Sequence, residues 1–189
     1  MGSPVTLTDN SGKSWQDLLT DGGDGPSRRL RVDVAQTGFF AGREFRTFKE
    51  INLATSQAYY VKAVVPVNII LFANVISLTG GELKLYTSVG GTESGTFSET
   101  LPIFARNTMS ERPTPVYTPQ VVLTAGGIVT GETNLDLVWV KAADNTNFSG
   151  NVGGSTGDER GVAANTYHFR LLSVSASTGV WNVWWEERP

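Results

Sequence analysis

Residues 180–187 read Val-Trp-Asn-Val-Trp-Trp-Glu-Glu, a stretch in which apolar and polar side chains alternate with a period of two. That period is typical of a β-strand with one face in a core and the other face outside it. Trp181, Val183 and Trp185 share one face, and Trp184 lies on the opposite face. We therefore predict a strand that buries Trp181 and Trp185 and turns Trp184 the other way.

The same period recurs along the chain from Leu30 onward. The expected strands lie in Leu30–Val34, Tyr59–Val67, Ile69–Leu78, Leu83–Thr87, Leu135–Val140 and Tyr167–Leu172. Gly-rich turn signals separate these segments, and no long segment has the 3.6-residue period of a helix. We therefore predict an all-β fold, a two-sheet antiparallel sandwich of the jelly-roll type.

Proline, glycine and phenylalanine residues add local expectations. Pro66 interrupts a β-branched run and predicts a strand end, an edge or a bulge. Gly80-Gly81 predicts a hairpin turn. A further aromatic strand region, bent at Gly38 and Gly42, is expected around Phe39, Phe40, Phe45 and Phe48.

The sequence divides into two parts: residues 1–27 form a polar arm, and residues 28–189 form the β-sandwich domain. Within the arm, Ser14 is a suitable N-cap for a short helix that ends near Leu19. Trp15, Leu18 and Leu19 would share one face of that helix. This apolar anchor has two possible uses: the arm folds back on its own domain, or it docks on a neighbouring subunit.

Charge and composition exclude several classes of protein. The 189 residues carry a net charge of −3, and the densest basic cluster is only Arg28, Arg29 and Arg31, so we expect no nucleic-acid partner. No signal peptide is visible, and the most apolar stretch is interrupted by Pro66 and Asn68, so we expect no membrane partner. The chain has no cysteine, which excludes disulfides and thiol chemistry.

The residues needed for catalysis do not form a recognisable pattern. His168 is the only histidine, and no nucleophile elbow accompanies it, so we expect a surface or interface histidine. Pairs of carboxylates suited to glycoside hydrolysis exist in any chain with 18 acidic residues. The loop from Asp144 to Asp158 offers oxygen ligands for calcium, but without the spacing of a known site. We therefore predict no enzyme activity, no cofactor and no bound metal.

Tryptophan side chains leave carbohydrate binding as an alternative, because indole rings stack on sugar faces. Tryptophan is also common in cores and interfaces. Since Trp181 and Trp185 are assigned to the buried face, Trp184 remains as the free candidate for a sugar platform.

Four stretches carry a resemblance to a known family. They are Gln36-Thr-Gly-Phe-Phe-Ala-Gly-Arg43, Asn107-Thr-Met-Ser-Glu-Arg-Pro-Thr-Pro-Val-Tyr-Thr-Pro119, Val152-Gly-Gly-Ser-Thr-Gly-Asp-Glu-Arg-Gly161 and Trp184-Trp-Glu-Glu-Arg-Pro189. From about residue 28 to the end, the chain resembles a family of short virion structural proteins of tailed bacteriophages. Phage proteins of this size with jelly-roll folds often decorate or cement the capsid, commonly as trimers. The resemblance supplies no catalytic residue.

The resemblance implies a virion structural protein, assembled in the host cytoplasm. The expected role is a capsid decoration or cement protein that stabilises the head by bridging subunits of the major capsid protein. The alternative is a neck, tail or fibre-associated structural protein that binds a host glycan. A glycan hydrolase is a third and more remote class.

We expect a homo-oligomer, a trimer. Its subunit contacts should use the few charged residues that lie close together in the sequence. The candidate interface residues are Trp15, Arg106, Glu111, Arg112, Asp158, Glu159 and Arg160. Pro113, Pro115 and Pro119 favour a stiff extended segment after Glu111-Arg112. The same charges are equally suited to ion pairs within one chain, which would contribute about 0–1 kcal/mol to stability.

Overall fold

The computed structural model describes residues 19–20, 29–30, 37–108, 117–142, 148–151 and 160–189. The chain divides into two compact units, residues 1–37 and 38–189, and the predicted division at residues 27 and 28 falls inside the first unit. In that unit, β1 (Leu19–Thr20) pairs antiparallel with β2 (Arg29–Leu30). The predicted helix was therefore wrong at its last residue, Leu19, because its backbone is extended in this ladder. Residues 14–18 lie outside the described residues.

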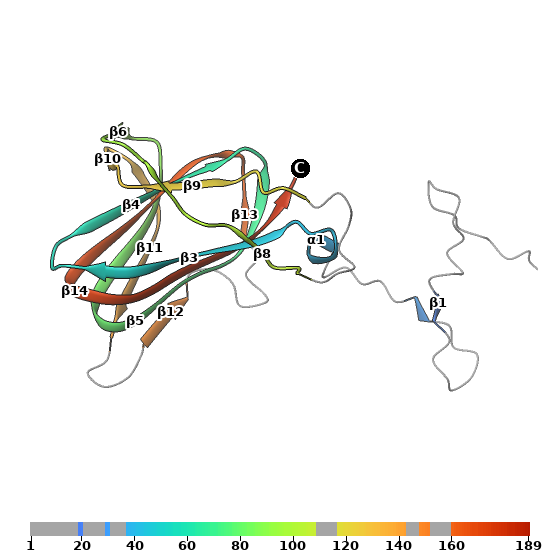
Figure 1. The fold of residues 1–189 in the computed structure, drawn as a ribbon, viewed down its shortest axis with the longest axis horizontal. Helices are drawn as coiled ribbons and strands as arrows, with labels where there is room; N and C mark the ends of the chain where they lie inside the picture. The colour runs from blue at the N-terminus through green and yellow to red at the C-terminus, as the bar shows by residue number, and fades with distance from the viewer. Residues whose placement is uncertain (1–18, 21–28, 31–36, 109–116, 143–147, 152–159) are drawn as a thin grey trace, which may run out of the picture. The chain divides into compact units, whose positions relative to one another are not determined.

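The second unit is built almost entirely of strands (Figure 1). Its elements are α1 (Thr37–Phe40), β3 (Glu44–Leu53), β4 (Ala58–Val65), β5 (Asn68–Val89), β6 (Thr92–Ser94), β7 (Glu99–Thr100), β8 (Phe104–Ala105), β9 (Val122–Ala125), β10 (Ile128–Thr130), β11 (Thr133–Lys141), β12 (Phe148–Asn151), β13 (Arg160–Val162) and β14 (Asn165–Arg188). As Pro66 predicted, β4 ends at Val65. The expected strand around Phe39 and Phe40 was wrong, because these residues form the single helical turn α1.

Two long strands, β5 and β14, pass through both layers of the fold. The second half of β14 lies between β3 and the first half of β5, and β8, β12 and β13 extend this layer. The first half of β14 lies between β4 and the second half of β5, and β7, β9 and β11 extend the other layer. The two layers are therefore one antiparallel sheet folded over, which gives the all-β sandwich that the sequence predicts. Its connectivity as a jelly roll stays a prediction.

Glycines stand where β5 and β14 bend together from one layer into the other. A Cβ atom at Gly81 would lie 2.1 Å from the carbonyl oxygen of Ala176, and one at Gly179 would lie 2.1 Å from that of Ser77. Gly81 also has a φ of +84°, which other residues rarely adopt. The predicted hairpin at Gly80-Gly81 was wrong: the glycines allow a close crossing of two backbones, and β5 continues to Val89.

The core lies between the two layers and contains the two tryptophans that the sequence alternation assigned to the buried face. Trp181 and Trp185 are 0% and 1% exposed, whereas Trp184 is 38% exposed, so the predicted facing is confirmed. Phe169 and Trp181, from opposite halves of β14, have ring centroids 5.1 Å apart. One strand thus contributes to both walls of the core.

Candidate functional site

The only histidine lies in a buried contact and not on the surface. His168 is 3% exposed, and its Nε2 atom lies 3.1 Å from a carboxylate oxygen of Glu93. The other oxygen of Glu93 accepts a hydrogen bond from Lys62 at 2.7 Å. That bond lowers the pKa of Glu93, and the contact with His168 adds to the effect. Of the two expected positions, at the surface or at an interface, the surface position was wrong, because β6 brings Glu93 over the outer face of β14; the interface position stays a prediction.

This contact joins β4, β6 and β14, and among the described residues no hydroxyl group is hydrogen-bonded to the imidazole. The hydroxyl of Ser88 donates to the backbone carbonyl of His168, not to its ring. The ring centroids of Phe97 and His168 are 6.4 Å apart, with the two rings tilted relative to each other. Within the described residues, no group of three or more His, Asp or Glu side chains is arranged to hold a metal ion.

A second buried carboxylate, that of Glu187, organises the C-terminal end of β14. It is 0% exposed and accepts hydrogen bonds from the backbone N–H groups of Gln120 and Val121 at 2.9–3.1 Å. The hydroxyl of Tyr117 and the indole N–H of Trp185 donate to it at 3.1 and 3.3 Å. Three donors from the segment before β9, two backbone N–H groups and one hydroxyl, therefore fix this segment against the last strand.

Three of the four stretches that carry the family resemblance meet in this region. Glu187 belongs to one stretch and Tyr117 to another. Asn107 donates from its side-chain amide to the carbonyl of Phe39 at 3.1 Å, which joins a third stretch. Arg43 of that third stretch lies 3.9 Å from Glu186. The residues named from these stretches thus hold distant segments of the chain together and stabilise its fold.

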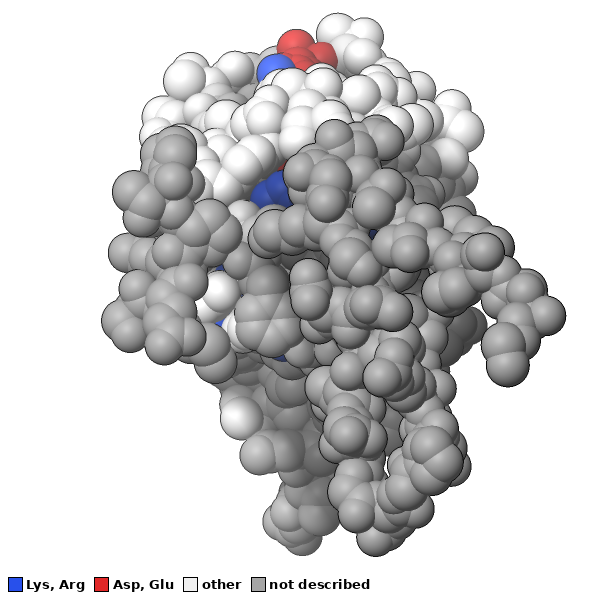
Figure 2. All heavy atoms as spheres, turned by 90° about the vertical axis from the view of Figure 1, so that its right-hand side faces the viewer, with Lys and Arg blue, Asp and Glu red and all other residues white. Residues whose placement is uncertain are grey.

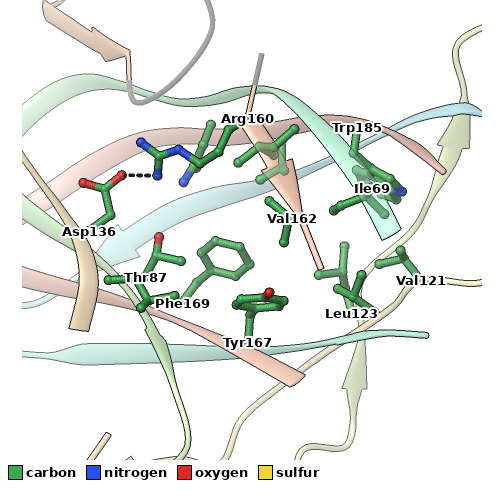
Figure 3. Close-up of a pocket in the computed structure, with 15 residues that line it drawn as sticks. Ile69, Thr87, Val121, Leu123, Asp136, Arg160, Val162, Tyr167, Phe169 and Trp185 are labelled. Carbon is green, nitrogen blue, oxygen red and sulfur yellow. Dashed lines mark hydrogen bonds and ion pairs between the residues drawn. The ribbon is translucent and has the colours of Figure 1, made fainter. Parts of the chain in front are cut away.

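An apolar cavity of about 90 Å³ opens between the two layers. Val162, Tyr167 and Phe169 extend into the same space, as Figure 3 shows. At its rim, Arg160 of β13 and Asp136 of β11 form an ion pair at 2.9 Å. A cavity with such a lining tends to stay dry and suits only a small apolar group.

Three of the most exposed apolar side chains lie on one edge strand. On β11, Leu135, Leu137 and Trp139 are 55%, 50% and 61% exposed. The intervening Val140 is fully buried, and Val138 packs against the core. In the part of the chain that the structure describes, β11 pairs with β5 alone, so its other side is an open edge.

The sequence alternation located β11 but did not decide which of its faces is buried. Both faces carry large apolar residues, so the pattern is ambiguous. The structure turns Trp139 outward, where its indole N–H donates to Glu82 at 2.7 Å and Lys84 lies 4.4 Å from its ring. Trp184 was predicted to be the one free tryptophan, but Trp139 is the more exposed of the two.

A smaller apolar group lies on the outer face of the other layer. Phe48 of β3 and Phe104 of β8 are stacked with ring centroids 5.7 Å apart, and both are about 40% exposed. The guanidinium of Arg106 lies 5.2 Å from the ring of Trp184. These rings contact one another and a cation, so they are partly covered within the chain.

The predicted interface residues are only partly described. Trp15, Glu111, Arg112, Asp158 and Glu159 lie outside the described residues. Arg106 pairs with Glu44 at 2.7 Å, and Arg160 pairs with Asp136, both within the chain. On the side of the molecule drawn in Figure 2, few charged atoms of the described residues are visible, and at the top of the view acidic and basic atoms lie side by side. Their use between subunits stays a prediction.

No family model, curated protein or solved structure matches this chain. Among the described residues, no helix has the length and apolar character needed to cross a membrane. The function is therefore argued from the residues and their geometry.

Proposed function

We propose that this protein is a structural subunit of a bacteriophage particle that acts by assembly and catalyses no reaction. Its role is that of a capsid decoration or cement protein, which bridges subunits of the major capsid protein and stabilises the head. The observation that carries an assembly role is the apolar open edge of β11, with Leu135, Leu137 and Trp139 each at least half exposed.

An edge strand of this kind is unfavourable in an isolated subunit. Its free N–H and C=O groups and exposed apolar side chains invite pairing with another strand. A partner that covers the edge removes apolar surface from water, which is favourable by roughly 25 cal/mol per Å². Where assembly brings such a partner next to the edge, binding shifts the equilibrium toward the assembled particle.

Two further features support a role in a particle. The charged fraction of the chain is only 17%, below the roughly 25% of an average soluble domain. The stretches that resemble phage virion proteins form structural contacts around Glu187 and Asn107. The proposal includes a trimer on the shell, assembly in the host cytoplasm, and neither nucleic acid nor membrane as a partner.

The proposal is tested by adding the purified protein to heads of the corresponding phage that lack it. Wild-type protein is expected to bind the heads and to raise the temperature at which they release DNA. Leu137→Lys places a charge on the open edge and is expected to reduce head binding at least tenfold.

Ile128→Lys is the matched control, because Ile128 is 51% exposed on a different strand, β10. It is expected to bind heads like the wild type. Labelled protein that microscopy finds on the tail alone, or on no part of the particle, would contradict the capsid role.

The second candidate is a neck, tail or fibre-associated structural protein that binds a host glycan. Trp139, 61% exposed, provides the observation in its favour, because an exposed indole can stack on a sugar. Glycan-array binding that Trp139→Ala abolishes, together with a tail location, would favour this candidate.

A further inference from the structure

The folded sheet ends very differently on its two sides. On one side, the outermost strands are β7 and β8, which are two residues long. On the other side, β11 is nine residues long, and among the described strands it pairs with β5 alone. Short edge strands discourage pairing with another chain, whereas a long apolar edge strand favours it.

The β11 edge also lacks the features that usually protect such an edge. It contains no proline, and its one lysine, Lys141, is its last residue. Asp136 is already neutralised by Arg160. A bulge lies between Asn134 and Asp136, so the six residues from Asp136 to Lys141 form a regular segment. This segment is ready to accept another strand.

A second copy of β11 matches this segment. In an antiparallel pair related by a two-fold axis, residues that lie opposite each other point to the same face. With the axis at Val138, Leu137 of each copy lies opposite Trp139 of the other, and Asp136 lies opposite Val140. The central opposed pairs then lie within the regular segment, Lys141 lies opposite Leu135 at each end of the pair, and no like charges face each other.

Neighbouring registers fit less well. An axis at Leu137 would bring Leu135, which belongs to the bulge, opposite Trp139. An axis at Trp139 would place Lys141 opposite Leu137. The register centred on Val138 is favoured because it opposes Leu137 and Trp139 at the central positions and leaves Lys141 and the bulge at the ends of the pair.

The buried area indicates how strong such a contact is. The seven residues from Leu135 to Lys141 that pair in this register span about 24 Å, so their pairing would cover on the order of 300 Å² of each copy. That is less than half of the roughly 800 Å² per partner found in stable interfaces. The pair is therefore weak between free subunits and becomes effective when other contacts hold many copies together.

We propose that β11 pairs antiparallel with β11 of a second copy about a two-fold axis through Val138, joining neighbouring subunits on the particle. This inference rests on the proposed assembly function and names the partner of its open edge. It is separate from the trimer contacts, which would use other residues.

The absence of cysteine in the sequence allows a direct test, because each introduced cysteine is the only thiol. In Val138→Cys the two thiols lie opposite each other, with Cβ atoms about 5 Å apart, which is within reach of a disulfide after a small adjustment. In the matched variant Lys141→Cys they are about 20 Å apart in the same strand. Under mild oxidation, Val138→Cys is expected to form covalent dimers at least tenfold faster than Lys141→Cys.

A second pair of variants tests the outer face without altering the half-buried Val138. A mixture of Leu137→Cys and Trp139→Cys is expected to give mainly the mixed dimer, with few dimers of either variant alone. This measurement also decides the question if Val138→Cys does not fold.

Equal cross-linking at positions 138 and 141, with no preference for the mixed 137–139 dimer, would overturn the pairing of two β11 strands. If Leu137→Lys still prevented head binding in that case, the edge would have a capsid partner, and the proposed function would stand. Position-specific cross-linking without head binding would support the strand pair and contradict the capsid role.

Discussion

Four tryptophans show how the interior of the sandwich differs from its outer surface. Inside, the indole N–H of Trp181 donates to Asn74 at 2.6 Å, and that of Trp185 donates to Glu187. Outside, Trp139 and Trp184 each have a cationic side chain, Lys84 or Arg106, over the ring. The interior rings are fixed by buried polar partners, and the exterior rings remain available for contact. The same residue type therefore stabilises the fold in one region and offers a surface in the other.

The largest expected effect on stability comes from removing one of the buried tryptophan rings. Trp181→Ala removes a fully buried ring that packs against Phe169, and we expect it to cost about 3–5 kcal/mol of unfolding free energy. Trp139→Ala is the matched exterior variant and should cost about 1 kcal/mol or less, the scale of one exposed cation–π contact. Urea unfolding of both variants measures the difference, and equal losses would refute the contrast.

The next effect tests whether the interior polar partners matter as much as the rings. Glu187→Gln replaces one acceptor oxygen by an N–H₂ group that faces the backbone donors of Gln120 and Val121. We expect a loss of about 1–3 kcal/mol, the cost of leaving a buried donor unpaired. Glu50→Gln, at an exposed position of β3, is the control and should leave the unfolding midpoint unchanged. A midpoint for Glu187→Gln equal to that of the control would contradict this role.

A smaller effect on stability is expected at the rim of the cavity. Arg160→Ala removes an ion pair to Asp136 in which the arginine side chain is 53% exposed. Solvent screens such a pair, so the loss should be about 0–1 kcal/mol. Sedimentation velocity gives the complementary result: a change in oligomeric state would place Arg160 at a subunit interface, and an unchanged state would limit it to the intrachain pair.

The smallest effect concerns pH. The hydrogen bond from Lys62 holds the pKa of Glu93 below its ordinary value of 4.5. A lowered carboxyl pKa stabilises the folded state above pH 4.5, and this contribution is lost as the pH falls through the folded-state pKa. Glu93→Gln should therefore flatten the acid side of the stability curve. Unfolding midpoints of the wild type and of Glu93→Gln, measured from about pH 6 down to about pH 3, provide the check. If the midpoints of both proteins changed equally with pH, this interpretation would be incorrect.

The fold class and the facing of the last strand could be predicted because alternation alone determines them. Trp181 and Trp185 follow a strict period of two, so their burial was clear from the sequence. The bend at Gly80-Gly81 could not be predicted in the same way, because a glycine pair suits a hairpin turn as well as a close crossing of strands. Only the approach of Ala176, almost 100 residues later, distinguishes the two.

The candidate site shows a related limit. Leu137 and Trp139 alternate with Val138 and Val140, so the sequence offers two apolar faces of similar quality. Burial of Val140 follows from its pairing with Leu83, which is itself fully buried. The pairing with β5 therefore determines that Trp139 points outward. The local sequence pattern of β11 does not contain this information.

The two long strands also determine when the protein can fold. β14 pairs with β3, β4 and β5, whose residues precede it by roughly 80 to 140 positions. Contacts between such distant segments form slowly, on the scale of milliseconds to seconds. During synthesis the earlier strands have no partner for the centre of either layer until residues 165–188 emerge. A chain that stops before β14 should therefore expose the apolar faces of β3, β4 and β5 and aggregate.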